Sequence, residues 1–266
     1  MSDTNVMAVY NGGTSWTRNT NCIIGPASGY DTTGICLNIA GVGNIGATLI
    51  SNRHFIFNTH TGIAAGNTLY FVNNSNTTFA YTVDNVQMIG PYGQGYTDIS
   101  IGYFTTTVDA SLTYYKVFPS TFENYLQFGS AFGVPIVYPY MPLFYMDQEK
   151  KFLCGDLKFI ISANPPADQS DVLKPIFSYD TARYNNSEPT VGGDSGNILF
   201  APINNEIVLL GGWYTGTAGS KSPGNVIGST SCIHKHISAI NSAMTSLAGT
   251  SYQLTQFDLS GYQTYP

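Results

Sequence analysis

Residues 198–216 read ILFAPINNEIVLLGGWYTG, and this stretch decides the fold class. Two apolar runs, Ile198–Phe200 and Ile207–Leu210, lie on either side of the pair Asn204-Asn205. Asparagine tolerates the left-handed backbone conformation that a two-residue hairpin turn requires. The stretch therefore predicts a tight antiparallel β-hairpin.

Runs of the same kind recur along the 266-residue chain, separated by Gly, Asn, Asp and Pro. The composition, with 28 Gly, 19 Tyr and 15 Phe, also favours strands and tight turns over long helices. We therefore expect an all-β, antiparallel fold. The runs are Gly46–Ile50, His54–Phe57, Leu69–Val72, Phe79–Val83, Ile99–Tyr103 and Leu157–Ile161.

One segment near the C-terminus has the spacing of an α-helix instead. Ser231 is placed to cap its start, and Gly249 is placed to end it. A tail of residues 250–266 follows. The apolar residues that repeat at helical spacing are Ile233, Ile237, Ile240, Met244 and Leu247.

Charge and hydropathy narrow the classes of function. The net charge is −6, and the ten Lys and Arg are scattered, so we expect neither a nucleic-acid partner nor a polybasic contact with a membrane. No apolar run approaches the length of a membrane span. The first 13 residues, MSDTNVMAVYNGG, lack the features of a signal peptide. We expect a cytoplasmic or virion-associated protein rather than a secreted one.

The four cysteines, Cys22, Cys36, Cys154 and Cys232, form no CxxC pair and have no histidine at zinc spacing. We therefore expect four buried thiols and no metal site. A Cys22–Cys36 disulfide is the alternative in an oxidising compartment.

The segment GGDSGN, residues 192–197, immediately precedes the hairpin. Its glycines allow a tight turn that exposes the Ser195 hydroxyl, and consecutive backbone N–H groups can point at a developing oxyanion. A serine hydroxyl is a weak nucleophile, so it needs a base and an orienting acid. An ordinary glycine-rich turn is the alternative.

Candidates for the base and the acid lie upstream. His60 ends a strand-like run and opens a loop, from which it can reach a cleft. Asp98 begins another strand, although a turn or capping role is the alternative for it. His54 lies within a strand-like run and is expected to be structural. His234 and His236 are two residues apart on the expected helix, so they form a poor metal pair and are expected to be solvated.

In order and spacing, these segments resemble the trypsin-like, or chymotrypsin-like, serine proteases, and bacterial or viral members more than animal ones. His60 and Asp98 are 38 residues apart, and Asp98 and Ser195 are 97 apart. The resemblance extends from about Ile23 to Gly249. It is carried by Gly46–Ile50 leading to Asn58-Thr59-His60, by Asp98–Ile101, by Gly193–Asn197 and by the hairpin that follows.

The resemblance implies two six-stranded antiparallel β-barrels with a C-terminal α-helix. It divides the chain into an extension (1–22), a barrel carrying His60 and Asp98 (23–108), a barrel carrying Ser195 with the closing helix (109–249), and a tail (250–266). A catalytic triad of these three residues would then hydrolyse peptide bonds in a polypeptide substrate through an acyl-enzyme. Gly193 and Ser195 would supply the oxyanion hole, without a cofactor.

A structural or binding protein on the same fold is the alternative function. Such a protein would assemble into a larger particle such as a virion, with self-processing or vestigial protease activity.

The resemblance also implies a substrate-binding pocket. Pro189 stands where members that cleave after Lys or Arg carry an aspartate, so we predict a neutral or apolar residue before the cut. Gly212 and Gly216 are expected to leave room along its wall. The pocket residues are Pro189, Thr190, Gly212, Trp213, Tyr214 and Gly216.

Ile23-Ile24-Gly25 is similar to the terminus that activating cleavage frees in animal members, where the new amine pairs with the equivalent of Asp194. No Lys or Arg precedes Ile23 directly, and the nearest is Arg18. We therefore predict a chain that is competent with its first 22 residues attached. Asp194 would then be held by backbone or hydroxyl donors, because a buried unpaired carboxylate is costly.

Overall fold

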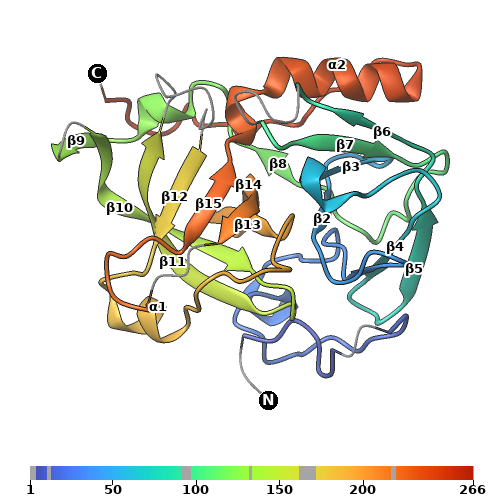
Figure 1. Cartoon of the computed structure of the whole chain (residues 1–266), viewed down its shortest axis with the longest axis horizontal. Coiled ribbons are helices and arrows are strands. Elements are labelled where there is room, and N and C mark those ends of the chain that lie inside the picture. Colours follow the sequence, from blue (N-terminus) through green and yellow to red (C-terminus); the bar gives the residue numbers. More distant parts are fainter. Residues whose placement is uncertain are drawn as a thin grey trace.

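The computed structural model describes residues 4–10, 13–90, 97–131, 134–161, 172–216 and 220–265. Strands dominate this part of the chain, and its helices are few (Figure 1). Residues 1–3 and 11–12 of the expected extension and Pro266 of the expected tail lie outside it.

The C-terminal half contains a closed six-stranded antiparallel barrel (Figure 1). Its strands pair in the order β10-β11-β12-β15-β14-β13, and β13 pairs with β10 again to close the circle. Strand β9 extends β10, and β8 pairs with β14 in parallel. The bounds are β8 (Lys116–Val117), β9 (Phe128–Ala131), β10 (Val134–Met146), β11 (Phe152–Ile161), β12 (Val172–Ile176), β13 (Ile198–Ile203), β14 (Glu206–Gly216) and β15 (Gly228–Ser231).

The N-terminal half consists of two separate antiparallel sheets, β2-β3-β7-β6 and β1-β4-β5. A second closed barrel was expected, and the described strands do not form one. Strand β5 runs into β6 through a two-residue corner, where the Val83 N–H bonds to Asn67 O and the Asp84 N–H bonds to Tyr103 O. The chain thus changes sheets there. The bounds are β1 (Asn38–Ile39), β2 (Ala47–Leu49), β3 (His54–Phe57), β4 (Thr68–Val72), β5 (Thr78–Thr82), β6 (Asn85–Met88) and β7 (Ser100–Tyr103).

Three apolar clusters form the core. One lies within the N-terminal half and contains Phe55, and one fills the C-terminal barrel and contains Trp213. The third includes Ile101 of β7 and Phe200 of β13, so it joins the two halves. Burial of apolar surface therefore holds the halves together as well as each half separately.

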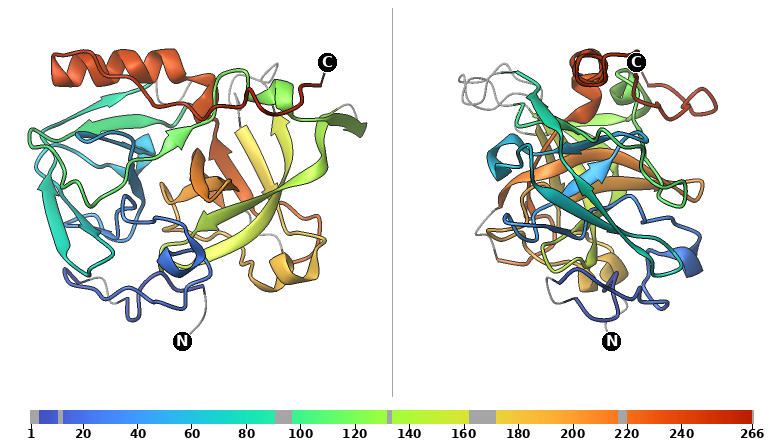
Figure 2. Two further views of the ribbon diagram at one scale, coloured as in Figure 1. Left: turned by 180° about the vertical axis from the view of Figure 1, so that it is seen from behind. Right: turned by 90° about the vertical axis from the view of Figure 1, so that its right-hand side faces the viewer.

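The predicted helix is α2 (Ile237–Ala248), and it follows a short 3-10 helix, η4 (Ile233–Lys235). Gly249 ends it with φ 66°, as predicted. Ser231 was expected to cap it, but this residue is buried in β15, and His236 occupies the N-cap. In Figures 1 and 2, α2 lies along β6 and β7, so a C-terminal element covers the N-terminal half.

The remaining helices are short: α1 (Thr181–Asn185), η1 (Pro26–Ser28), η2 (Thr59–Thr61) and η3 (Phe122–Tyr125). None of the helices in the described ranges is long and apolar enough to cross a membrane. The Asn204-Asn205 hairpin turn is confirmed, with both residues at positive φ between β13 and β14. The four cysteines are buried free thiols, which confirms the favoured expectation over the disulfide.

Candidate active site

Strand pairing brings His60 and Asp98 together. His60 lies in η2, directly after β3, and Asp98 lies two residues before β7. Since β3 and β7 are paired, with Phe57 opposite Ser100, their ends meet at one edge of the sheet. The Asp98 carboxylate accepts hydrogen bonds from the His60 backbone N–H (3.0 Å) and from His60 Nδ1 (2.7 Å).

Ser195 comes from the loop that precedes β13 in the other half of the molecule. Its Oγ lies 2.7 Å from His60 Nε2. With Nδ1–H donating to Asp98, Nε2 is left to accept the proton of the serine hydroxyl. The three side chains therefore form one continuous hydrogen-bonded row, with Asp98 buried and the His60 ring partly exposed.

Asp98 is held in a conformation that costs energy. Its φ is 39°, in the left-handed region that non-glycine residues seldom adopt. The Asn58 side-chain amide also donates to Asp98 Oδ2, at 2.8 Å. This donor fixes the orientation of the carboxylate.

Asn58 is a site residue that the sequence did not single out. The signal in the sequence is a polar amide directly after the apolar run Phe55–Phe57, two residues before His60. In the structure Asn58 is buried. Its Nδ2 also lies 3.5 Å from Gly212 O, and a Cβ on Gly212 would be 2.4 Å from its Oδ1. Asn58 thus joins Asp98 to β14 of the other half.

The backbone around Ser195 has the form that an anion site needs. Gly193 has φ 105° and Gly196 has φ 73°, so glycine is required at both. The N–H groups of Gly193 and Ser195 bond to no acceptor in the described part of the chain. Two free, neighbouring N–H groups can stabilise a developing oxyanion.

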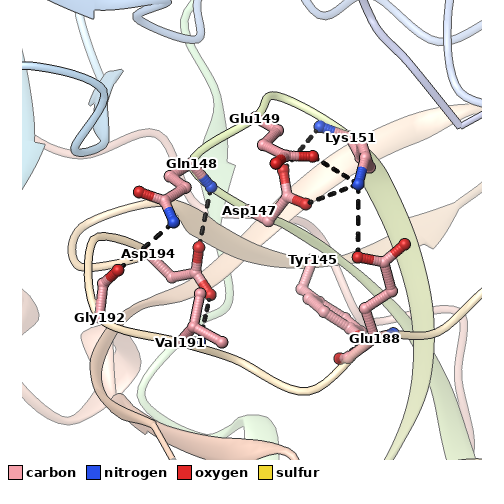
Figure 3. A network of polar contacts seen from close by, with 9 residues as sticks. All are labelled: Tyr145, Asp147, Gln148, Glu149, Lys151, Glu188, Val191, Gly192 and Asp194. Carbon is pink, nitrogen blue, oxygen red and sulfur yellow. Dashed lines mark hydrogen bonds and ion pairs between the residues drawn. The ribbon is translucent and has the colours of Figure 1, made fainter.

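Asp194 supports this loop from behind (Figure 3). Its carboxylate accepts the backbone N–H of Val191 at 2.7 Å and of Gln148 at 2.9 Å. Burial raises the pKa of Asp194, and the two N–H donors and the Lys150 charge oppose that rise. The expectation that backbone donors would hold this carboxylate is confirmed. Ile24, in the segment considered for an activating cut, is buried.

Of the expected pocket residues, Pro189 and Thr190 precede Ser195 in the same loop, and the other four lie on β14, whose Trp213 O accepts the Gly196 N–H at 2.8 Å. Thr190 is buried, and its Oγ1 donates to Ile227 O. A Cβ on Gly216 would lie 2.9 Å from Thr190 O, so this glycine permits close backbone contact. Gly212 is filled in the same way by Asn58. The role of these two glycines in a substrate pocket stays a prediction.

The other predicted pocket residues have varied surroundings. Trp213 is buried in the barrel, where its ring packs edge-on against Tyr145. Pro189 and Tyr214 are half-buried. Pro189 places no charge at this position.

The remaining histidines lie outside the row. His54 is buried between Ser51 and the Met244 carbonyl, and burial lowers its pKa to about 4, so it is structural as predicted. His234 was expected to be solvated, but it is buried in η4 with its Nε2 3.1 Å from Glu123. Within the described ranges, no group of three or more His, Cys, Asp or Glu could hold a metal ion.

Fold and site together define a class: a mostly β protein with a closed six-stranded barrel and a second β unit, compatible with a chymotrypsin-like fold, in which serine, histidine and aspartate lie in one row. No known family model matches the chain, and no curated protein matches its sequence.

Proposed function

We propose that this protein is a serine endopeptidase. The observation that supports the proposal best is the continuous row from Asp98 through His60 to Ser195, with both contacts at 2.7 Å, beside two unengaged backbone N–H groups. A nucleophile, a base, an orienting acid and an oxyanion site are the parts that acyl transfer requires.

The reaction proceeds in two stages. Ser195 Oγ attacks the carbonyl carbon of the substrate while His60 Nε2 takes the hydroxyl proton, and the Gly193 and Ser195 N–H groups bind the oxyanion. His60 then gives this proton to the leaving amine as the C–N bond breaks. Water, activated by His60, hydrolyses the acyl-enzyme and restores Ser195. Asp98 holds the ring and stabilises its protonated form.

Labelling with a fluorophosphonate reagent tests the proposal. The reagent forms a covalent bond with an activated serine, so we expect one label per wild-type chain and none on Ser195→Ala. Ser246→Ala, the same change on an exposed position of α2, is the matched control and should label fully. A wild-type protein that stays unlabelled would instead favour a structural or binding protein.

The contacts around Thr190 bear on which substrate residue is preferred before the cleaved bond. Since Thr190 lies against both Gly216 and Gly228, the space before the cleaved bond suits a small neutral side chain. Cleavage of a peptide library should therefore be enriched in such residues at this position. Enrichment in Lys or Arg would contradict this expectation.

A further inference from the structure

One fully buried lysine contacts the loop that carries the candidate nucleophile. Lys150 is in the turn between β10 and β11, with no solvent exposure. Its Nζ donates to Asn197 Oδ1 at 2.6 Å and to Asn44 O at 2.8 Å. Asn197 lies two residues after Ser195, and Asn44 belongs to the N-terminal half. One ammonium group therefore connects three segments that meet at the site.

The backbone of the turn directs this side chain inward. Lys150 has φ 57°, and its N–H closes the turn onto Asp147 O. The N-terminal segment fixes the outer side, because the Val6 N–H bonds to Lys150 O and the Phe152 N–H bonds to Thr4 O. In Figures 1 and 2 this segment lies along the lower edge of the molecule, from the junction of the two halves to below β4 and β5.

The neighbouring lysine in the same turn, Lys151, has the partly exposed surroundings that are usual for this residue type. Lys151 pairs with Glu149 and Glu188 in the partly exposed network of Figure 3. Exposed pairs of this kind contribute little to stability. Lys150, in contrast, loses its hydration without a carboxylate in direct contact, which is costly for an ammonium group. Its position therefore calls for a role other than stability.

Asn197 transmits the position of the ammonium group to the serine loop. Its backbone N–H and its Nδ2 both donate to Asp194 O, at 3.0 and 3.2 Å. Its own carbonyl accepts the Trp213 N–H at 3.0 Å. The peptide group between Asp194 and Ser195, which carries the Ser195 N–H, is thus fixed by a side chain that Lys150 holds.

We propose that Lys150 is a positioning residue: its charged Nζ fixes Asn197, and through it the orientation of Ser195 and of the Gly193 and Ser195 N–H groups. This inference rests on the proposed protease function. It explains how the loop is ordered by an amine from within the chain, with the N-terminal segment still attached.

The proposal has a consequence for pH. Burial lowers the pKa of Lys150 to about 8, against the opposing influence of Cys36, Asp147 and Asp194. Burial raises the pKa of Cys36 to about 11 and that of Asp147 to about 6, and also raises those of Asp194 and of Tyr10 beside Cys36. The pKa of Lys150 therefore lies between those of Asp147 and Cys36.

Activity and stability should then respond in opposite directions. Above pH 8 the loss of charge on Lys150 lowers activity. The unfolded chain, whose lysine has the ordinary pKa of about 10.5, binds more protons than the folded chain between pH 8 and 10.5. The contribution of this group to the free energy of unfolding therefore rises with pH in that window.

The experiment compares wild type, Lys150→Met, Lys150→Arg and the control Lys151→Met in fluorophosphonate labelling rate and in hydrolysis of p-nitrophenyl acetate. We expect Lys150→Met to lose about 10- to 100-fold in labelling rate and kcat with little change in KM, less than or equal to the loss of an oxyanion donor itself. Lys150→Arg should restore part of the rate, and Lys151→Met should match wild type.

The pH profile supplies a second readout that needs no variant to fold. Wild-type labelling should decline through about pH 8 with the near-ultraviolet circular dichroism unchanged, and Lys150→Met, if folded, should lack this decline. Equal rates in wild type and Lys150→Met, or a wild-type rate that stays constant to pH 10, would overturn the inference alone. A wild-type protein without any labelling would overturn the protease proposal, and this inference with it.

Discussion

The two halves of the molecule contribute to the site in different ways. The N-terminal half has strands of two to five residues in two sheets, and the pairing of β3 with β7 is enough to place His60 beside Asp98. The C-terminal half has strands of up to 13 residues in a closed barrel, and it supplies Ser195.

The contact between His60 and Ser195 therefore depends on how the halves meet. Gly46 N–H bonds to Ser195 O at 2.9 Å, and Asn58 and Lys150 also bridge the halves. The comparison teaches that the histidine–aspartate pair is a local property of one sheet. The alignment of the nucleophile, in contrast, is a property of the interface.

The largest expected effect comes from the local pair. Asp98→Asn should leave the fold intact and lower the labelling rate by about 10⁴-fold, because an amide would stabilise the wrong tautomer of the ring. The labelling rate measures the loss of reactivity, and a thermal unfolding curve shows whether the fold is intact. A rate within tenfold of wild type would show that the pair is not the orienting element.

Gly46→Ala tests the interface. A Cβ there would lie 2.2 Å from backbone atoms of Gly196 and Asn197, so one half must shift. We expect a loss of about 1–3 kcal/mol of stability, and a fall of about 10²-fold in labelling rate if Ser195 moves by about 1 Å. Gly261→Ala, where nothing lies within 4 Å, is the control and should change neither quantity.

His54 links the N-terminal sheet to α2 through the contact of its Nε2 with Met244 O, and we expect this contact to be sensitive to acid. Burial lowers its pKa from 6.5 to about 4, so the unfolded chain binds more protons between these values, and stability falls as pH falls through this window. From pH 7 to 5 we expect a loss of about 2 kcal/mol from this group. Denaturant unfolding of wild type and His54→Gln measures it. Equal pH slopes in the two proteins would exclude His54 as the cause.

The smallest expected effect comes from Asn58→Ala, which removes the amide between Asp98 and β14. We expect about a tenfold lower labelling rate, equivalent to about 1.4 kcal/mol, with the Nδ1 contact of His60 retained. Asn74→Ala, at an exposed position of the turn between β4 and β5, is the control and should react like wild type. A loss as large as that in Asp98→Asn would mean that Asn58 is indispensable for the row.

Much of this arrangement was accessible from sequence because it depends on local patterns. The Asn204-Asn205 turn, the helix ending at Gly249, the structural His54 and the four free thiols all follow from residue type and spacing. The order and spacing of His60, Asp98 and Ser195, through their resemblance to a protease family, pointed to three residues that lie together.

The tertiary structure decided what depends on contacts between distant segments. The chain changes sheets at Val83 and Asp84, because the Val83 N–H bonds to Asn67 O next to β4 and the Asp84 N–H bonds to Tyr103 O in β7. No local sequence pattern predicts these two bonds. At Gly212 and Gly216 an added Cβ would meet Asn58 Oδ1 and Thr190 O, close contacts that residue spacing does not predict. The sequence does not distinguish Lys150 from its neighbour Lys151. Sequence specifies local conformation through each residue's own sterics, whereas burial and partners are set by chain segments far apart, as with Asn44, Lys150 and Asn197.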